Sequence, residues 1–181
     1  MFSAKVFINY FCIFAMLLLC ARTAWAEIET EYKIQAGFLL NLTSYVYWPH
    51  SEKHERVICV RGSNPFGRFL DDLIQLRKTN EYGEQLSVRY LQIEEPLDGC
   101  DVSYVTHDAF VNSESKPAQP YTGVLSISNS PEFLAHGGLL QFKKDGRRVK
   151  MVIDLDNSKQ AGINFSSELL QLAQIVGRGS L

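Results

Sequence analysis

The residues of this chain that could carry chemistry are its four histidines, its four cysteines and one glycine-rich turn. His50 and His54 stand four positions apart, a spacing that on a helix could let both bind one metal ion. They follow Pro49 in a polar stretch without a third ligand nearby, so we expect no metal site there. His107 and Asp108 could form an acid–base pair. Adjacent side chains seldom face each other, however, and a cap at a strand end is the simpler interpretation.

The glycine-rich turn is residues 62–67, Gly-Ser-Asn-Pro-Phe-Gly, which follow a predicted strand. Open α/β sheets bind ligands at such strand ends. The turn lacks the spacing of a dinucleotide or phosphate-binding loop, and Pro65 removes an amide that a phosphate would use. The chain has no G-x-S-x-G motif of a hydrolase, and Cys59 is not part of a C-x-x-C motif. We therefore expect no enzyme and no catalytic, cofactor-binding or metal-binding residue.

The N-terminal segment, residues 1–26, has the three parts of a secretory signal peptide. Lys5 provides the charged start, and residues 6–19 form an almost continuous apolar run. The Ala-Trp-Ala sequence at 24–26 provides a cleavage site after Ala26. The pattern predicts that the protein is exported to the periplasm.

Cleavage would leave one domain, residues 27–181. No other stretch reaches the roughly 20 apolar residues of a membrane-spanning helix, so we expect no membrane insertion after cleavage. Two alternatives remain open. Cys20 could be a lipoprotein site, although the large Leu19 disfavours it, and the N-terminal segment could stay as an uncleaved anchor.

The mature domain is acidic and retains two cysteines. Cleavage removes two basic residues and no acidic one, which leaves 16 basic and 20 acidic residues and a formal charge of −4. This charge does not favour nucleic acid as a partner. Cys59 and Cys100 form an even count in an exported chain, which predicts a disulfide, with two free buried thiols as the alternative. Closing a loop of about 40 residues would stabilise the fold by roughly 4 kcal/mol.

A helix over residues 31–49 is the element around which the domain is organised. Its apolar positions recur every three or four residues, which predicts a buried face, and Pro49 is expected to end it. The positions that carry this face are Ile34, Phe38, Leu39, Leu40, Leu42, Tyr45 and Val46.

The rest of the chain alternates predicted strands with helices and turns. Asn64 is expected to cap a helix beginning at Pro65, and Asp145-Gly146 predicts a hairpin. Strands are expected at 56–62, 85–93, 100–106, 123–128, 139–144 and 147–155, and helices at 65–76, 109–111, 131–135 and 167–176. This order predicts an α/β fold: a single three-layer domain with a mixed, mainly parallel sheet flanked by helices and a C-terminal β-hairpin.

Three sequence blocks stand out by their order and spacing. The first is Ala-Gly-Phe-Leu-Leu-Asn-Leu at 36–42, followed by Tyr-Trp-Pro at 47–49. The second is Ile-Cys-Val at 58–60 with Cys-Asp-Val at 100–102, and the third is Ala-Gly-Ile-Asn-Phe-Ser-Ser-Glu-Leu-Leu-Gln-Leu-Ala at 161–173. By these three blocks the chain resembles the YfiR-like family of periplasmic proteins. The resemblance covers nearly the whole mature sequence.

The resemblance implies a regulatory protein and not an enzyme. Members bind the periplasmic sensor domain of an inner-membrane diguanylate cyclase and repress it, which lowers cyclic di-GMP and affects biofilm formation. The resemblance also implies an α/β fold, a homodimer, an outer-membrane lipoprotein that releases repression, and a structural disulfide that falls on Cys59 and Cys100. No motif marks the partner-binding residues.

The sequence departs from the family pattern at two points. Asp154 replaces the usual asparagine after the last predicted strand, and the second cysteine pair of some members is absent. A second functional hypothesis is a periplasmic small-molecule binding protein, whose pocket would be formed by the loops after Arg61, His107 and Ser128.

Overall fold

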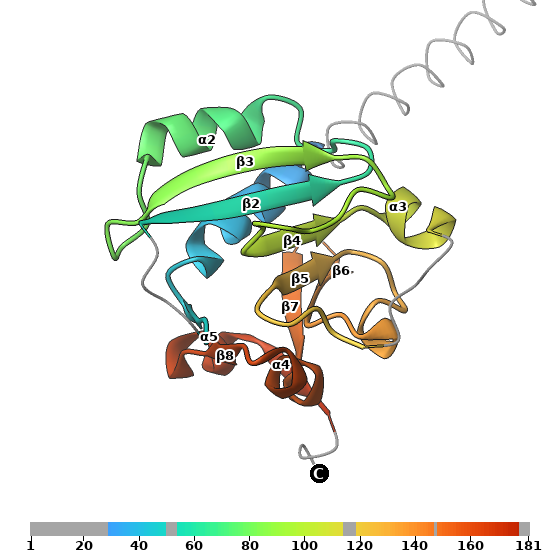
Figure 1. The fold of residues 1–181 in the computed structure, drawn as a ribbon. Helices are drawn as coiled ribbons and strands as arrows, with labels where there is room; N and C mark the ends of the chain where they lie inside the picture. The colour runs from blue at the N-terminus through green and yellow to red at the C-terminus, as the bar shows by residue number, and fades with distance from the viewer. Residues whose placement is uncertain (1–28, 50–53, 114–118, 147, 178–181) are drawn as a thin grey trace, which may run out of the picture.

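The computed structural model describes residues 29–49, 54–113, 119–146 and 148–177 (Figure 1). The predicted signal peptide and His50 lie outside the described residues. Among the described helices, none combines the length and the apolar composition that crossing a membrane requires.

A seven-stranded sheet forms the centre of the domain, in the order β3-β2-β4-β5-β6-β7-β9 (Figure 1). Neighbouring strands are parallel except for the antiparallel pair β6 and β7. The predicted α/β class, the mixed and mainly parallel sheet and the hairpin are confirmed. The strands are β2 (Glu55–Arg61), β3 (Gln85–Leu91), β4 (Val102–Val105), β5 (Leu125–Ser128), β6 (Leu140–Asp145), β7 (Arg148–Asp154) and β9 (Gln174–Val176).

One face of the sheet packs against the first helix, described over 29–42, and against α2 (Phe69–Arg77) and α5 (Ser167–Leu172). Leu39 of the first helix and Leu70 of α2 are fully buried in this main core, together with Ile58 of β2. Because side chains alternate along a strand, the neighbouring Cys59 belongs to a different cluster, on the opposite face.

The opposite face carries a thinner layer. The helix α3 (His107–Asn112) and the 3₁₀ turn η1 (Leu134–His136) pack there through Phe110 and Phe133. A second small cluster surrounds Cys59 and Cys100. These elements complete the predicted three-layer arrangement.

The first helix ends at residue 42, seven residues earlier than predicted. The hydroxyl of Thr43 donates a hydrogen bond to the Leu40 carbonyl at 2.6 Å, and a turn follows. Residues 46 and 47 then form β1 (Val46–Tyr47), which pairs antiparallel with β8 (Asn164–Phe165). Strand pairing with a distant segment therefore overrides the helical pattern at this end.

The predicted C-terminal helix is also too long. Its start is correct, because the Ser166 hydroxyl accepts a hydrogen bond from the Leu169 amide at 3.3 Å. The helix α5 ends at Leu172, and β9 then pairs parallel with β7. The backbone hydrogen bonds offered by the free edge of β7, together with the β-branched Ile175 and Val176, favour a strand there.

Three local predictions about helix ends and turns need correction. Asn64 does not cap α2: its side chain accepts from the Phe66 amide and donates to the Gly67 carbonyl, which makes a tight turn, and the helix begins at Phe69. The 3₁₀ turn η1 replaces the helix expected at 131–135. In the hairpin, Asp145 is not a turn residue, because it is the last residue of β6 and pairs with Arg148.

The sequence interpretation missed the helix α4 (Leu155–Ala161). Asp154 is its N-cap, since its Oδ1 atom accepts a hydrogen bond from the Asn157 amide at 2.9 Å. Aspartate and asparagine are comparably good N-caps. An asparagine at this position could therefore fill the same local role.

Candidate functional site

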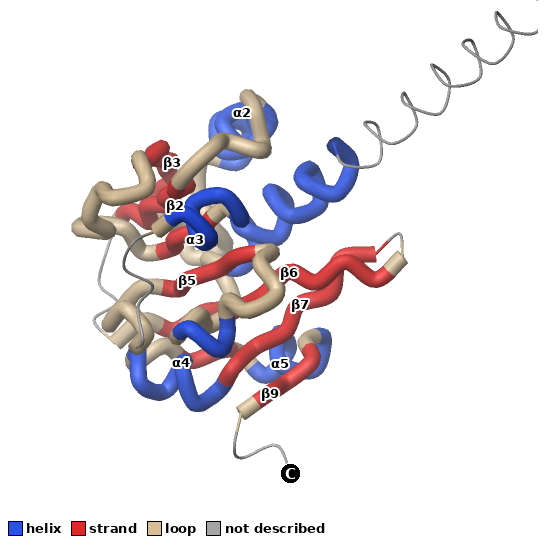
Figure 2. The backbone as a smooth tube through the Cα atoms, turned by 90° about the vertical axis from the view of Figure 1, so that its right-hand side faces the viewer, coloured by secondary structure: helices blue, strands red, loops and turns tan. Residues whose placement is uncertain are grey.

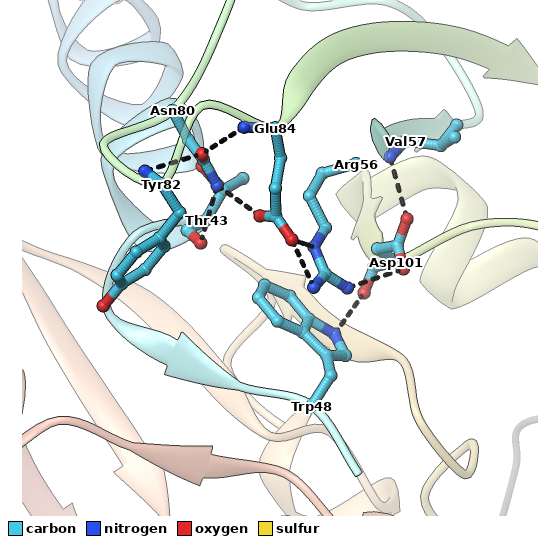
Figure 3. A network of polar contacts seen from close by, with 8 residues as sticks. All are labelled: Thr43, Trp48, Arg56, Val57, Asn80, Tyr82, Glu84 and Asp101. Carbon is cyan, nitrogen blue, oxygen red and sulfur yellow. Dashed lines mark hydrogen bonds and ion pairs between the residues drawn. The ribbon is translucent and has the colours of Figure 1, made fainter. Parts of the chain in front are cut away.

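A buried arginine, Arg56, lies at the centre of a polar cluster at the amino end of β2 (Figure 3). Its Nη2 and Nε atoms lie 2.6 and 3.0 Å from Oε1 of Glu84, and its Nη1 atom lies 3.3 Å from Oδ1 of Asp101. The Trp48 ring covers the guanidinium, with 4.3 Å between Cζ and the ring centroid. This is a cation–π contact added to two ion pairs.

Asp101 joins three segments of the chain. Its Oδ2 atom accepts a hydrogen bond from the Val57 amide at 2.9 Å. Its backbone carbonyl accepts from the Trp48 indole at 3.4 Å. A buried charge of this kind is costly unless it is paired, and here Arg56 pairs it.

Asn80 extends the cluster to the end of the first helix. Its amide nitrogen donates to Glu84 at 2.5 Å and to the carbonyl of Thr43 at 3.4 Å. Its Oδ1 atom accepts from the backbone amides of Tyr82 and Glu84, each at 3.0 Å (Figure 3). The turn before β3 is therefore fixed against both the helix and Arg56.

The predicted cysteine pair lies directly beside this cluster in sequence. The sulfur atoms of Cys59 and Cys100 are 1.94 Å apart, at disulfide distance, and their Cα atoms are 5.8 Å apart. Both residues are buried, at 0% and 5% exposure, among Leu91, Leu97 and Val124. The pair connects β2 to the residue that precedes Asp101.

The third sequence block, residues 161–173, contacts the end of the first block, residues 47–49, and the turn before it. Tyr47 pairs with Asn164 in the β1–β8 ladder, and the Ser166 amide donates to the Tyr45 carbonyl at 2.9 Å. Gly162 has a positive φ of 73°, and a Cβ atom placed there would lie 3.5 Å from the Pro49 ring. All three blocks thus converge at the amino end of the parallel strands, where they build one scaffold.

Sequence reasoning placed Trp48, Cys100 and Asp101 in these blocks but missed Arg56 and Glu84. Arg56 is only the first residue of a predicted strand and Glu84 only part of a predicted turn, and neither is assigned a role. The signal that could have found them is the charge of Asp101 next to a predicted buried cysteine, because a buried carboxylate requires a cationic partner.

The histidines within the described ranges do not gather into a site. His107 has its Nδ1 atom 2.9 Å from Ser130 Oγ, and His136 has its Nδ1 atom 3.0 Å from the Glu132 carbonyl. Across the described ranges, no group of three or more metal-binding side chains is close enough to hold an ion.

The strand-end cap expected near His107 is present. Thr106 is the N-cap of α3, and Asp108 accepts hydrogen bonds from both the amide and the hydroxyl of Ser63. Partial burial raises the pKa of the Asp108 carboxyl, but the hydrogen bonds with Thr106 and Ser63 outweigh it, so the pKa lies below its usual value.

A small cavity of about 30 Å³ lies at the carboxyl ends of β2 and β4, between α3 and η1. Phe110, Phe133 and Arg61 contribute to its lining. The Arg61 side chain donates to the Glu95 carbonyl, while its Nε atom is buried without a hydrogen-bond partner in the described structure. A groove of about 400 Å³ shares Arg61 and Tyr121 with this cavity. The position is the one expected for a ligand pocket.

An apolar groove of about 200 Å³ lies between the first helix and α5. Phe38 and Tyr45 line one side, Leu172 lines the other, and Met151 of β7 also contributes. Leu172 is 78% exposed and so adds apolar area at the rim of the groove. Glu168 adds one negative charge to the rim.

The fold and the convergent blocks define a small α/β protein in which a disulfide joins β2 to the segment just before β4, beside a buried arginine–carboxylate cluster. The chain belongs to the YfiR/HmsC-like family, whose model matches residues 32–174. This family is generally regulatory, and membership is consistent with repression of a diguanylate cyclase. No curated protein matches the chain.

Proposed function

We propose that this protein is a periplasmic regulator that represses an inner-membrane diguanylate cyclase by binding its periplasmic sensor domain. The family match over residues 32–174 carries the proposal, because it spans the described fold from the first helix to β9. The protein would favour the inactive state of the cyclase by binding that state more tightly than the active one. Cyclic di-GMP and biofilm formation would then fall when the repressor is bound.

Export supports the same proposal. A signal peptide cleaved after Ala26 would deliver residues 27–181 to an oxidising compartment, where disulfides form and persist. The buried Cys59–Cys100 pair at bonding distance fits such a compartment. A homodimer and an outer-membrane lipoprotein that releases repression are further parts of the proposal.

The apolar groove between the first helix and α5 is the surface that we propose for the cyclase sensor domain. Leu172, Phe38 and Tyr45 place apolar area at the surface around it. Burying such area on association is favourable, and the exposed Leu172 would be covered in the complex.

The direct test is capture of the partner from membranes with the tagged mature protein, together with measurement of cyclic di-GMP in cells. Deletion of the repressor is expected to raise cyclic di-GMP, and deletion of the captured cyclase is expected to abolish this rise. Unchanged cyclic di-GMP after deletion of the repressor would contradict the proposal.

The alternative function, a small-molecule binding protein, is favoured by one observation. The buried Nε atom of Arg61 faces no described partner, and the cavity and groove that Arg61 lines lie at the ligand-binding end of a parallel sheet. A thermal-shift screen against small carboxylates separates the two functions. A large shift that Arg61→Gln removes, without a captured membrane partner, would favour the alternative.

A further inference from the structure

The hairpin formed by β6 and β7 concentrates positive charge on a protein that is otherwise acidic. Four basic side chains, Lys143, Lys144, Arg148 and Lys150, lie on this hairpin and are exposed, and we call them the basic tip. With Asp145 the described tip carries a formal charge of +3, whereas the mature domain is expected to carry −4.

The strand register places two of these cations opposite each other. Lys143 pairs with Lys150 across the hairpin, and directly opposed like charges destabilise a sheet. Lys150 reaches Asp145 at 2.5 Å, but neither Lys143 nor Arg148 forms an ion pair with any residue of the described ranges. The opposed lysines therefore destabilise the hairpin, and no ion pair of Lys143 or Arg148 within the described ranges offsets this effect.

Most of the positive charge lies on one face of the hairpin. Lys143, Arg148 and Lys150 share that face, and Lys144 lies on the other, where its ammonium is 3.4 Å from Glu31 of the first helix. The nearby cations affect the pKa of the Asp145 carboxyl. Its pKa lies below the usual value, first because of the hydrogen bond and charge of Lys150 and then because of the nearby Arg148 and Lys143.

The free end of the hairpin projects past the body of the domain (Figure 2). The tip cations stand on a narrow two-stranded ribbon, and none of them lines a described pocket. Three cations, Lys143, Arg148 and Lys150, on one exposed face of a projecting ribbon suit a broad, flat anionic surface better than a shaped acidic site on a protein.

We infer that the basic tip binds the anionic phospholipid surface of a membrane. Each lysine or arginine near such a surface strengthens binding by roughly fivefold, so a net charge of +3 corresponds to roughly a hundredfold. This contact would fall off within a Debye length and would hold the otherwise acidic domain in one orientation. It goes beyond the repressor function and does not depend on the cyclase.

The test is sedimentation of the mature protein with protein-free vesicles. One set contains phosphatidylcholine alone and the other also contains phosphatidylglycerol. Binding is expected only to the second set and is expected to weaken as salt is raised. The variant Lys143→Glu/Arg148→Glu breaks no described ion pair, turns the tip charge from +3 to −1 and is expected to lose more than about tenfold in binding.

The matched control is Arg68→Glu/Lys78→Glu, which makes the same change in net charge at the two ends of α2. These positions are exposed. They flank α2, which lies beside β3, the edge strand at the opposite end of the sheet from the hairpin. The control is expected to bind like the unchanged protein. Equal binding to both vesicle sets, or equal losses in both variants, would overturn the inference. So would binding to native membranes but not to protein-free vesicles, which would point to an acidic protein partner.

Discussion

Arg56 and Asp101 form an ion pair in which each side chain is only 3% exposed, with 3.3 Å between Nη1 and Oδ1. The pair joins the start of β2 to the short segment between Cys100 and β4. Trp48 of the first sequence block covers the Arg56 guanidinium.

Replacement of Asp101 by alanine is expected to lower the free energy of unfolding by about 3–5 kcal/mol, because it leaves Arg56 less well paired and the Val57 amide without its acceptor. Urea unfolding followed by circular dichroism measures the change. Asp98→Ala, in the exposed loop just before, is the control and is expected to change stability little. A loss below about 1 kcal/mol in Asp101→Ala would show that the pair is not a stabilising element.

Asp108 is expected to make stability depend on pH. Its folded pKa is lowered, so the carboxylate stabilises the fold above the unfolded pKa of about 3.9, and this contribution is lost as pH falls through the folded pKa. Asp108→Asn is therefore expected to be less stable at neutral pH, by on the order of 1 kcal/mol, and to approach the unchanged protein in acid. Thermal unfolding from neutral pH into acid measures both curves. A difference that stays constant over this range would contradict the assignment.

Loss of the Cys59–Cys100 bond is expected to lower stability by about 2–4 kcal/mol. Cys59→Ser and Cys100→Ser should melt at lower temperature and, if the proposed function holds, should raise cyclic di-GMP because less folded repressor is present. The double variant supplies the control, since a reducing agent should destabilise the unchanged protein but leave the double variant unaffected. Unchanged melting in both single variants would show that the bond contributes nothing.

The N-cap role of Asp154 predicts how stability changes when the asparagine usual in the family is placed there. Asp154→Asn should leave stability within about 0.5 kcal/mol, whereas Asp154→Ala should cost about 1 kcal/mol, because the Asn157 amide loses its acceptor. Chemical unfolding of the two variants side by side measures the difference. Equal losses in both would mean that the carboxylate charge matters more than the cap.

The apolar groove gives a prediction about partner binding. Leu172→Glu is expected to reduce capture of the cyclase by at least about tenfold without loss of folding, because a charge would enter the buried contact. Leu76 of α2 is a matched control, since it is also a helical leucine and is 84% exposed. Equal capture by Leu172→Glu and Leu76→Glu would place the contact elsewhere on the domain.

The sequence allowed the sheet to be predicted well where its signal was local. The strand around Ile58 has an apolar run typical of burial on both faces, and the alternation of Val149, Met151 and Ile153 marks an antiparallel strand. Both strands are present, in β2 and β7. The even count of cysteines led to the Cys59–Cys100 pair for a similar reason, since only two remain after the predicted cleavage.

The errors occur where distant segments decide the local structure. Val46 has the spacing of a helix but pairs with Phe165, and Val176 has the spacing of the predicted C-terminal helix but pairs with Asp154 of β7. The charge of Asp101 beside a predicted buried cysteine signals that a cationic partner is needed, but only the fold shows that this partner is Arg56. In each case the deciding partner stands far away in the sequence, beyond the reach of a local pattern.

The pairing of β1 with β8 also affects the order in which the protein can be completed. The chain is synthesised from its N-terminus. Val46 and Tyr47 therefore cannot form their strand pairs until Asn164 and Phe165 have been made. Until then β1 has no neighbour, and the outer edge of β7 is open to unwanted pairing with other chains. A nascent chain that stops shortly before β8 should therefore need a chaperone to stay dispersed, although nearly all of its core residues have already been made.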